Sequence, residues 1–303
     1  DWPQTNCYTD LWIGILHALG REPAAGLGFT VLQDFEGDQF TFFKVPLADL
    51  DELYGIRVQE LALYDTLEAH ILEQIERGRL VLVEVDGFYL PDTQGTSYRS
   101  EHIKTTIGVN SCDPAASRMD YFHNGGFFSL EGEDYRGVLR KEARFADMPD
   151  VLFPYVEFAK FDGPALTGAA LAEHARTLLA RHLARRPQHN PVAAFRARIA
   201  DQAKAVSERA PCFFHLYAFN TLRQLGANFE LLGSHLAWLA RQGDATGEAA
   251  EASARLSAGA KSFQFQLARA CNRKRFADLE NHLDPLVAAY DMAIGGLARL
   301  YRA

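Results

Sequence analysis

The sequence predicts an α+β fold, in which a mixed first part is followed by an all-helical second part. Of 303 residues, 48% are hydrophobic and 23% are charged, which is typical of a globular protein. Up to about residue 162, runs rich in Val, Ile and aromatic residues alternate with helical patterns. From 163 to 303, Ala, Leu, Arg and Glu recur at helical spacing. We therefore expect an α+β domain over 1–162 and a helical domain over 163–303.

The chain opens with a helical pattern that has a cysteine in its first turn. In "NCYTDLWIGILHALG", Thr5 or Asn6 can cap the helix and Gly20 can end it. Leu11 follows Cys7 on the same helical face, one turn later. We expect this helix to pack its apolar face on an antiparallel sheet.

The rest of the first part alternates strand and helix patterns. "GFTVLQDF" and "QFTFFKV" predict a hairpin, whereas "LADLDELYGI" and "DTLEAHILEQIERG" predict helices. "RLVLVEVDGFYL" predicts a strand, and the turn residues of "PDTQGTSYRSE" indicate a loop. "HIKTTIGVN" and "RMDYFHN" predict two strands joined by the turn 111–117.

The second part predicts a helical bundle. A break is expected near each of several prolines and near Gly243. The expected helices cover 165–186, 191–209, 213–241, 247–275 and 277–302.

Charge and cysteine content exclude several classes of protein. A net charge of −8 argues against a nucleic-acid partner, because phosphates are bound mainly by Lys and Arg. The four cysteines form no C-x-x-C pair, which argues against zinc and thioredoxin-type sites and favours a reduced, cytoplasmic protein. The acidic residues near 36 lack the spacing of a calcium loop, so we expect no metal site. The sequence contains no apolar run long enough to predict a membrane helix.

Cys7 is the candidate nucleophile. The amide groups and dipole of a helix N-terminus stabilise a thiolate, although a free cysteine on an apolar face is also a common packing residue. A cysteine nucleophile needs a base, and His102 is the best candidate because it starts a strand directly after a polar loop.

The third member of the triad is expected on the neighbouring strand. If strands 102–109 and 118–124 pair around Asp113, Asn124 lies opposite His102 and can orient its imidazole. Asp113 itself is roughly 35 Å along the strand at about 3.3 Å per residue. His123 points to the other face from Asn124 by side-chain alternation.

Further site residues follow from the same arrangement. The Cys7 backbone N–H can bind an oxyanion, helped by a side-chain amide from Gln4 or Asn6. The loop after residue 88 is either solvated or forms a cleft wall, since loops on a rigid scaffold often bind substrate. The residues proposed for that wall are Tyr89, Asp92, Tyr98 and Arg99.

The order of these motifs resembles the papain-like cysteine fold. Residues 1–160 are most similar to a bacterial family of uncharacterised proteins related to the N-terminal domain of butirosin biosynthesis protein H, near the double-glycine leader peptidases. The resemblance rests on "WPQTNCYTDLWIGILHALG", "DFEGDQFTFFK" and "VEVDGFYLPDTQGTSYRSEHIKTT". It implies Cys7 as nucleophile, His102 as base and Asn124 as orienting residue.

What the resemblance implies about function is a thiol-dependent acyltransferase. Such an enzyme moves an acyl or aminoacyl group from a carrier-protein thioester to a small amine, with no cofactor of its own beyond the phosphopantetheine of its substrate. One alternative is a cysteine peptidase or amidase with the same triad. The other is a non-catalytic papain-like binding module in which Cys7 is buried and inert.

Overall fold

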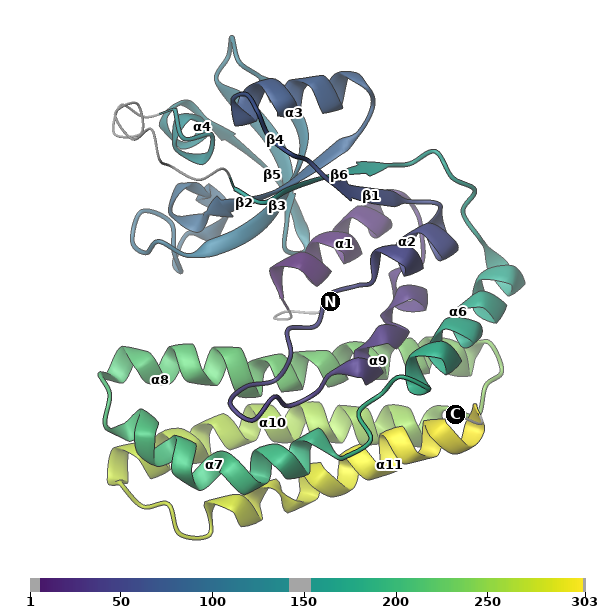
Figure 1. The fold of residues 1–303 in the computed structure, drawn as a ribbon, viewed down its shortest axis with the longest axis vertical. Coiled ribbons are helices and arrows are strands. Elements are labelled where there is room, and N and C mark those ends of the chain that lie inside the picture. The colour runs from purple at the N-terminus through teal and green to yellow at the C-terminus, as the bar shows by residue number, and fades with distance from the viewer. Residues whose placement is uncertain (1–5, 142–153, 302–303) are drawn as a thin grey trace. The chain divides into compact units, whose positions relative to one another are not determined.

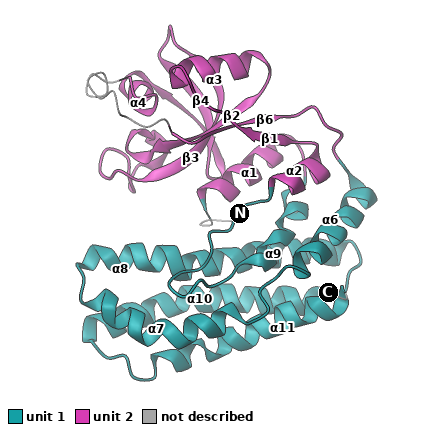
Figure 2. Ribbon diagram, in the orientation of Figure 1, with its two compact units in different colours: residues 1–6, 22–46, 166–303 teal, residues 7–21, 47–165 magenta. Residues whose placement is uncertain are grey.

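A computed structural model describes residues 6–141 and 154–301. The chain divides into two compact units, which Figure 2 colours separately. The sheet unit comprises residues 7–21 and 47–165, and the helical unit comprises residues 1–6, 22–46 and 166–303. The helical unit therefore includes a segment from the first fifty residues as well as the C-terminal part of the chain.

The sheet unit is built on one antiparallel sheet. Its strand order over the described residues is β1-β6-β2-β3-β4-β5, and every neighbouring pair is antiparallel. The strands are β1 (Arg57–Glu60), β2 (Leu80–Asp86), β3 (Lys104–Asp113), β4 (Arg118–His123), β5 (Gly126–Glu131) and β6 (Val156–Lys160). The predicted α+β class is confirmed.

One face of the sheet carries the main apolar core of this unit. Val83 of β2 and Ile107 of β3 are paired in register and fully buried, as expected for alternating positions on one face. Helix α3 (Leu67–Glu76) covers them and contributes Ile71. The Thr66 side chain caps α3 by accepting from the Ala69 amide, and α4 (Gly132–Val138) completes the cover.

Helix α1 (Cys7–Ala18) packs on the opposite face of the sheet, as Figure 1 shows. Gly108 of β3 makes this approach possible. A Cβ at residue 108 would lie 3.2 Å from both the Leu11 and the Leu80 methyl carbons. The helix begins at Cys7, as predicted. Helix α2 (Leu47–Tyr54) contacts β1 at the edge of the sheet.

The C-terminal part of the chain is helical, as predicted. Helices α8 and α9 continue through a π-helical turn, Phe219–Arg223, where one unbroken helix was expected. The described helices are α6 (Gly168–Leu183), α7 (Pro191–Ser207), α8 (Pro211–Ala218), α9 (Gln224–Arg241), α10 (Gly247–Arg273), the 3-10 helix η5 (Leu279–Leu283) and α11 (Asp284–Leu300).

The hairpin predicted over 28–35 and 39–45 is wrong. Residues Pro23–Leu32 form a long 3-10 helix, η1, and only an isolated bridge joins Phe35 to Phe40. Side chains of α9 take the place of a partner strand. The Asn228 amide donates to the Thr30 carbonyl at 2.9 Å, and His235 Nδ1 donates to the Ala24 carbonyl at 2.8 Å. These bonds satisfy buried backbone groups that a sheet would otherwise have to pair.

Candidate functional site

Cys7 is the first residue of α1 and carries a free, half-buried thiol. The next residue, Tyr8, fixes this end of the helix to the sheet. Its hydroxyl donates to Glu157 Oε2 at 2.7 Å, and the Tyr155 hydroxyl donates to Glu157 Oε1 at 2.7 Å. Burial, and then the Glu157 charge, raise the pKa of Tyr8 well above its ordinary value, so it stays a donor.

His102 lies two residues before β3 and is held by Asp86, at the end of β2, and by Phe88, two residues later. Its Nδ1 donates to Asp86 Oδ2 at 2.6 Å. The ring stacks on Phe88 with 4.6 Å between centroids. With the proton held on Nδ1, the lone pair of the imidazole is at Nε2, the nitrogen that can take a proton from a nucleophile. The side chain is 61% exposed.

The predicted register between His102 and Asn124 is wrong. Asp113 pairs with Arg118 and Gly108 pairs with Phe122, so the turn is centred between Ala115 and Ala116 and not at Asp113. Strand β4 ends at His123, and Asn124 has a φ of 48° in the turn to β5. The carboxylate beside His102 is therefore Asp86 of β2, a residue that the sequence analysis did not consider.

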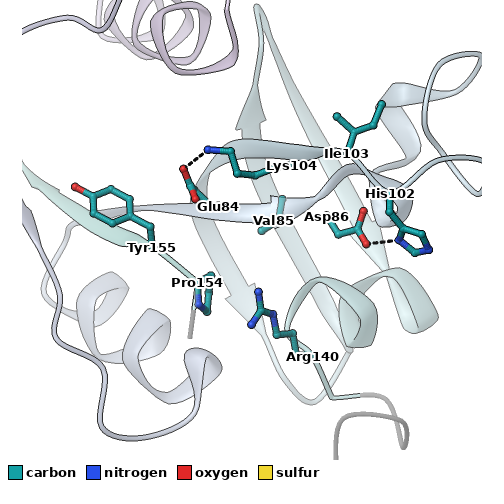
Figure 3. Close-up of a pocket in the computed structure, with 9 residues that line it drawn as sticks. All are labelled: Glu84, Val85, Asp86, His102, Ile103, Lys104, Arg140, Pro154 and Tyr155. Carbon is teal, nitrogen blue, oxygen red and sulfur yellow. Dashed lines mark hydrogen bonds and ion pairs between the residues drawn. The ribbon is translucent and has the colours of Figure 1, made fainter. Parts of the chain in front are cut away.

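A cavity of about 410 Å³ lies beside His102 (Figure 3). Within it, Lys104 pairs with Glu84 at 2.6 Å, next to the Asp86–His102 pair. None of its lining residues belongs to α1, but Tyr155 joins the cavity to Glu157 and so to the head of that helix. The lining consists of Glu84, Val85, Asp86, His102, Ile103, Lys104, Arg140, Pro154 and Tyr155.

Two residues expected in the cleft wall are instead buried. Tyr89 is 2% exposed and packs beneath Gly137 of α4. Asp92 accepts a hydrogen bond from Tyr121 Oη at 2.6 Å and another from His123 Nδ1 at 2.6 Å. The pair formed by Asp92 and His123 is almost completely buried, so it is an internal tie between the loop and β4.

The other two residues of the expected wall attach the same loop to α4. The Tyr98 hydroxyl donates to Asp134 Oδ2 at 3.0 Å, and the Arg99 guanidinium donates to Oδ1 of that carboxylate at 2.6 Å. None of Tyr89, Asp92, Tyr98 and Arg99 lines the cavity beside His102. The loop is thus a packed part of the sheet unit.

The structure describes one of the two candidate oxyanion amides. Gln4 lies outside the described residues. Asn6 is 4% exposed, and its Nδ2 donates to the Phe43 carbonyl at 2.6 Å. The backbone N–H groups at the start of α1 are the other donors that the sequence predicts for this role.

Two other kinds of site, for a metal ion and for a lipid bilayer, need clustered ligand side chains or long apolar helices. No group of three or more His, Cys, Asp or Glu side chains in 6–141 and 154–301 is arranged to hold a metal ion. Of the helices in those ranges, none has the length and apolar character needed to span a bilayer.

Comparison with known proteins identifies a family. A search of curated proteins finds no match. A family model described as the DUF1839 N-terminal domain matches residues 1–161, and one described as the DUF1839 C-terminal domain matches residues 168–299. Since the two models together cover nearly the whole sequence, the chain belongs to the DUF1839 family.

Proposed function

We propose that this protein is a cysteine-dependent acyltransferase, in which Cys7 is the nucleophile and His102 the base. The observation that carries the proposal is the Asp86–His102 pair, held at 2.6 Å beside a cavity in the same unit as Cys7. A helix headed by a cysteine and packed on an antiparallel sheet also agrees with a papain-like fold for the sheet unit. In this proposal Asp86 replaces Asn124 as the residue that orients the imidazole.

The Asp86–His102 pair suits a base that transfers a proton in each of the two half-reactions. Asp86 holds the proton on Nδ1 and stabilises the imidazolium that forms when Nε2 takes a second proton. The Cys7 thiol would lose its proton to Nε2 and attack the thioester carbonyl of an acylated carrier protein. The pantetheine sulfur then leaves as a thiol, taking that proton, and an acyl-enzyme remains.

The second half-reaction regenerates the enzyme. An amine attacks the acyl-enzyme carbonyl and gives its proton to His102, which returns it to the departing Cys7 sulfur. The products are an amide and the free thiol. Backbone N–H groups at the head of α1 would stabilise the oxyanion in both steps. The enzyme needs no cofactor of its own, and a carrier-protein donor would place the reaction in the cytoplasm.

Hydrogen bonds to Glu157 hold the head of α1, whose first residue is Cys7. Tyr8, next to Cys7, and Tyr155, in the cavity lining, donate to the two oxygens of this buried carboxylate. The first turn of α1 is therefore connected to the cavity through a single side chain. The reactivity of the Cys7 thiol tests whether Cys7 and His102 act together.

Replacement of His102 by Gln should slow alkylation of Cys7 at neutral pH. An imidazole that takes the thiol proton increases the fraction of reactive thiolate at neutral pH. We expect Cys7 to react roughly tenfold faster with iodoacetamide in the parent protein than in the His102→Gln variant. The rate for each cysteine would be measured by peptide mass spectrometry from pH 5.5 to 9, in a Cys212→Ser background because Cys212 is exposed.

His17→Gln is the matched control, because His17 is an exposed histidine at the far end of α1. If His102→Gln and His17→Gln give the same Cys7 profile, or if Cys7 resists alkylation in the native protein, the proposal is wrong. If the two variants differ, the intact mass of the protein after incubation with acylated carrier proteins would identify the acyl-enzyme. Cys7→Ser is the negative control. Cleavage of peptide amides without transfer would instead indicate the peptidase alternative.

A further inference from the structure

We infer that Phe88 is a positioning residue of the proposed reaction: its ring holds the imidazole of His102 in the orientation in which Nδ1 meets Asp86. This inference rests on the proposed function and adds to it a residue that acts through the base. It is carried by the stack between the two rings and by the contacts that fix Phe88 itself.

The hydrogen bond to Asp86 does not by itself fix the imidazole. The side chains of His102 and Asp86 are 61% and 34% exposed, and ion pairs between such exposed groups hold their partners only weakly. A ring that turns away from Asp86 is free to carry its proton on Nε2, and that tautomer has no lone pair there to take the thiol proton. A second contact is therefore needed to keep the base in its working orientation.

Phe88 supplies that second contact. Its ring stacks on the imidazole with 4.6 Å between centroids and 15° between planes. Its backbone N–H donates to Asp86 Oδ1 at 3.0 Å, while Oδ2 of the same carboxylate accepts from His102. One residue thus contacts both members of the pair, the carboxylate through its main chain and the imidazole through its side chain.

The Phe88 ring is held in turn by other residues of the loop after β2. Tyr89, which is 2% exposed, meets it edge-on with 5.1 Å between centroids. The guanidinium carbon of Arg99 lies 5.7 Å from the centroid of the Phe88 ring, and the same guanidinium donates to Asp134 of α4 at 2.6 Å. Tyr89 and Arg99 therefore support the base through Phe88, although neither lines the cavity.

The backbone closes this loop next to the stacked rings. The Gly87 N–H donates to the Ile103 carbonyl at 2.7 Å, which brings the adjoining residues Phe88 and His102 together. A Cβ at Gly87 would lie 3.0 Å from Ser97 Oγ and 3.2 Å from the Ile103 carbonyl oxygen, so the close approach depends on glycine. The stack is therefore built into the loop and is not a chance contact of two surface rings.

NMR of the histidine ring nitrogens tests the orientation without catalysis. At pH 9, where histidine is ordinarily neutral, the signal that disappears in His102→Gln should report a proton on Nδ1 in the parent protein. In Phe88→Leu the same signal should report a mixture of tautomers, because loss of an aromatic pair changes the balance between orientations by about two- to tenfold. Phe88→Tyr keeps the ring and should give the parental signal.

The reactivity of Cys7 should follow the orientation of the imidazole. We expect iodoacetamide at neutral pH to alkylate Cys7 about two- to tenfold more slowly in Phe88→Leu than in the parent, and Phe88→Tyr to restore the rate. Adding Phe88→Leu to His102→Gln should slow the reaction no further, because Phe88 acts through His102.

Phe127→Leu is the matched control and should leave both measurements unchanged. Phe127 is a 51% exposed phenylalanine of β5 that pairs with Phe122 and does not line the cavity. If Phe88→Leu melts well below the parent, Phe88→Met takes its place, because methionine fills the space with a flexible chain and has no flat face.

The inference is wrong if Phe88→Leu keeps the parental tautomer, if it leaves the Cys7 rate unchanged although His102→Gln slows it, or if Phe88→Tyr behaves like Phe88→Leu. The proposed function fails by a different result. In that case His102→Gln leaves the Cys7 rate unchanged, while Phe88→Leu still changes the tautomer of His102.

Discussion

His235 of α9 is a histidine that the fold keeps neutral. It is completely buried, and its Nδ1 donates to the Ala24 carbonyl of η1. Desolvation lowers the pKa of His235 to about 4, and the neighbouring His182 adds to this effect. The bond to Ala24 and the charge of Asp244 oppose it. Between pH 4 and pH 6.5 the buried ring therefore stays neutral, whereas a histidine in the unfolded chain would accept a proton.

This difference predicts a loss of stability in mild acid. The folded pKa of about 4 lies below the unfolded value of 6.5, so between these pH values the unfolded chain binds the extra proton. The contribution of His235 is complete above pH 6.5 and is lost as pH falls toward 4. We expect the free energy of unfolding to fall by about 2–3 kcal/mol from this group between pH 7.5 and 4.5, measured by urea denaturation.

His235→Gln is the control for that measurement, because glutamine does not titrate. The variant should be less stable at pH 7.5, but its stability should depend less on pH than that of the parent by about the same 2–3 kcal/mol. An equal pH dependence in both proteins would show that His235 is not the group responsible.

At the scale of elements, α4 lies against the short 3-10 helix η2 (Gly87–Tyr89) because residue 137 has no side chain. A Cβ at Gly137 would overlap the Tyr89 ring, which is 2% exposed and has no room to move. Gly137→Ala should therefore lower the free energy of unfolding by about 1–3 kcal/mol, as overpacking does in other cores. Urea titration followed by circular dichroism measures the change.

Gly296→Ala in α11 is the matched comparison. A Cβ at this position meets no atom within 4 Å, so the helix propensity of alanine should raise stability by up to about 1 kcal/mol. Equal effects of the two substitutions would contradict close packing between α4 and Tyr89.

Elements with strong periodicity were predictable, and short ones were not. The patterns of α3, α7 and α10 identified helices close to their observed bounds. Strands β1 and β6 escaped prediction because β1 has only four residues, three of them exposed, and β6 is recognisable mainly from its partners. Segment 28–35 has a strand-like composition, yet most of it forms η1 because α9 supplies its hydrogen-bond partners.

At the scale of the whole molecule, the helical unit depends on a distant part of the chain. Phe195 of α7 is fully buried against Phe35 and Phe40, with ring centroids 5.4 and 5.2 Å away. Asn228 and His235 of α9 bond to η1 in the same unit. The fragment 166–303 alone should therefore lack cooperative thermal unfolding, because these buried groups lose their partners.

Joining residues 22–46 to that fragment through a flexible linker should restore a cooperative transition. Calorimetry of both fragments measures the effect. If the fragment 166–303 alone melts cooperatively at the same temperature as the joined fragment, the segment 22–46 is not part of the unit.

The sequence by itself determined the fold class, the helical C-terminal region, the start of the first helix at Cys7 and a strand expected to begin at His102, which the structure begins two residues later at Lys104. Each of these follows from local periodicity, capping residues or turn residues. Only the tertiary structure decided that Asp86 accompanies His102 and that 22–46 joins the helices. Both depend on which segments pair across the chain, and side-chain periodicity within one segment carries no information about its partner's register.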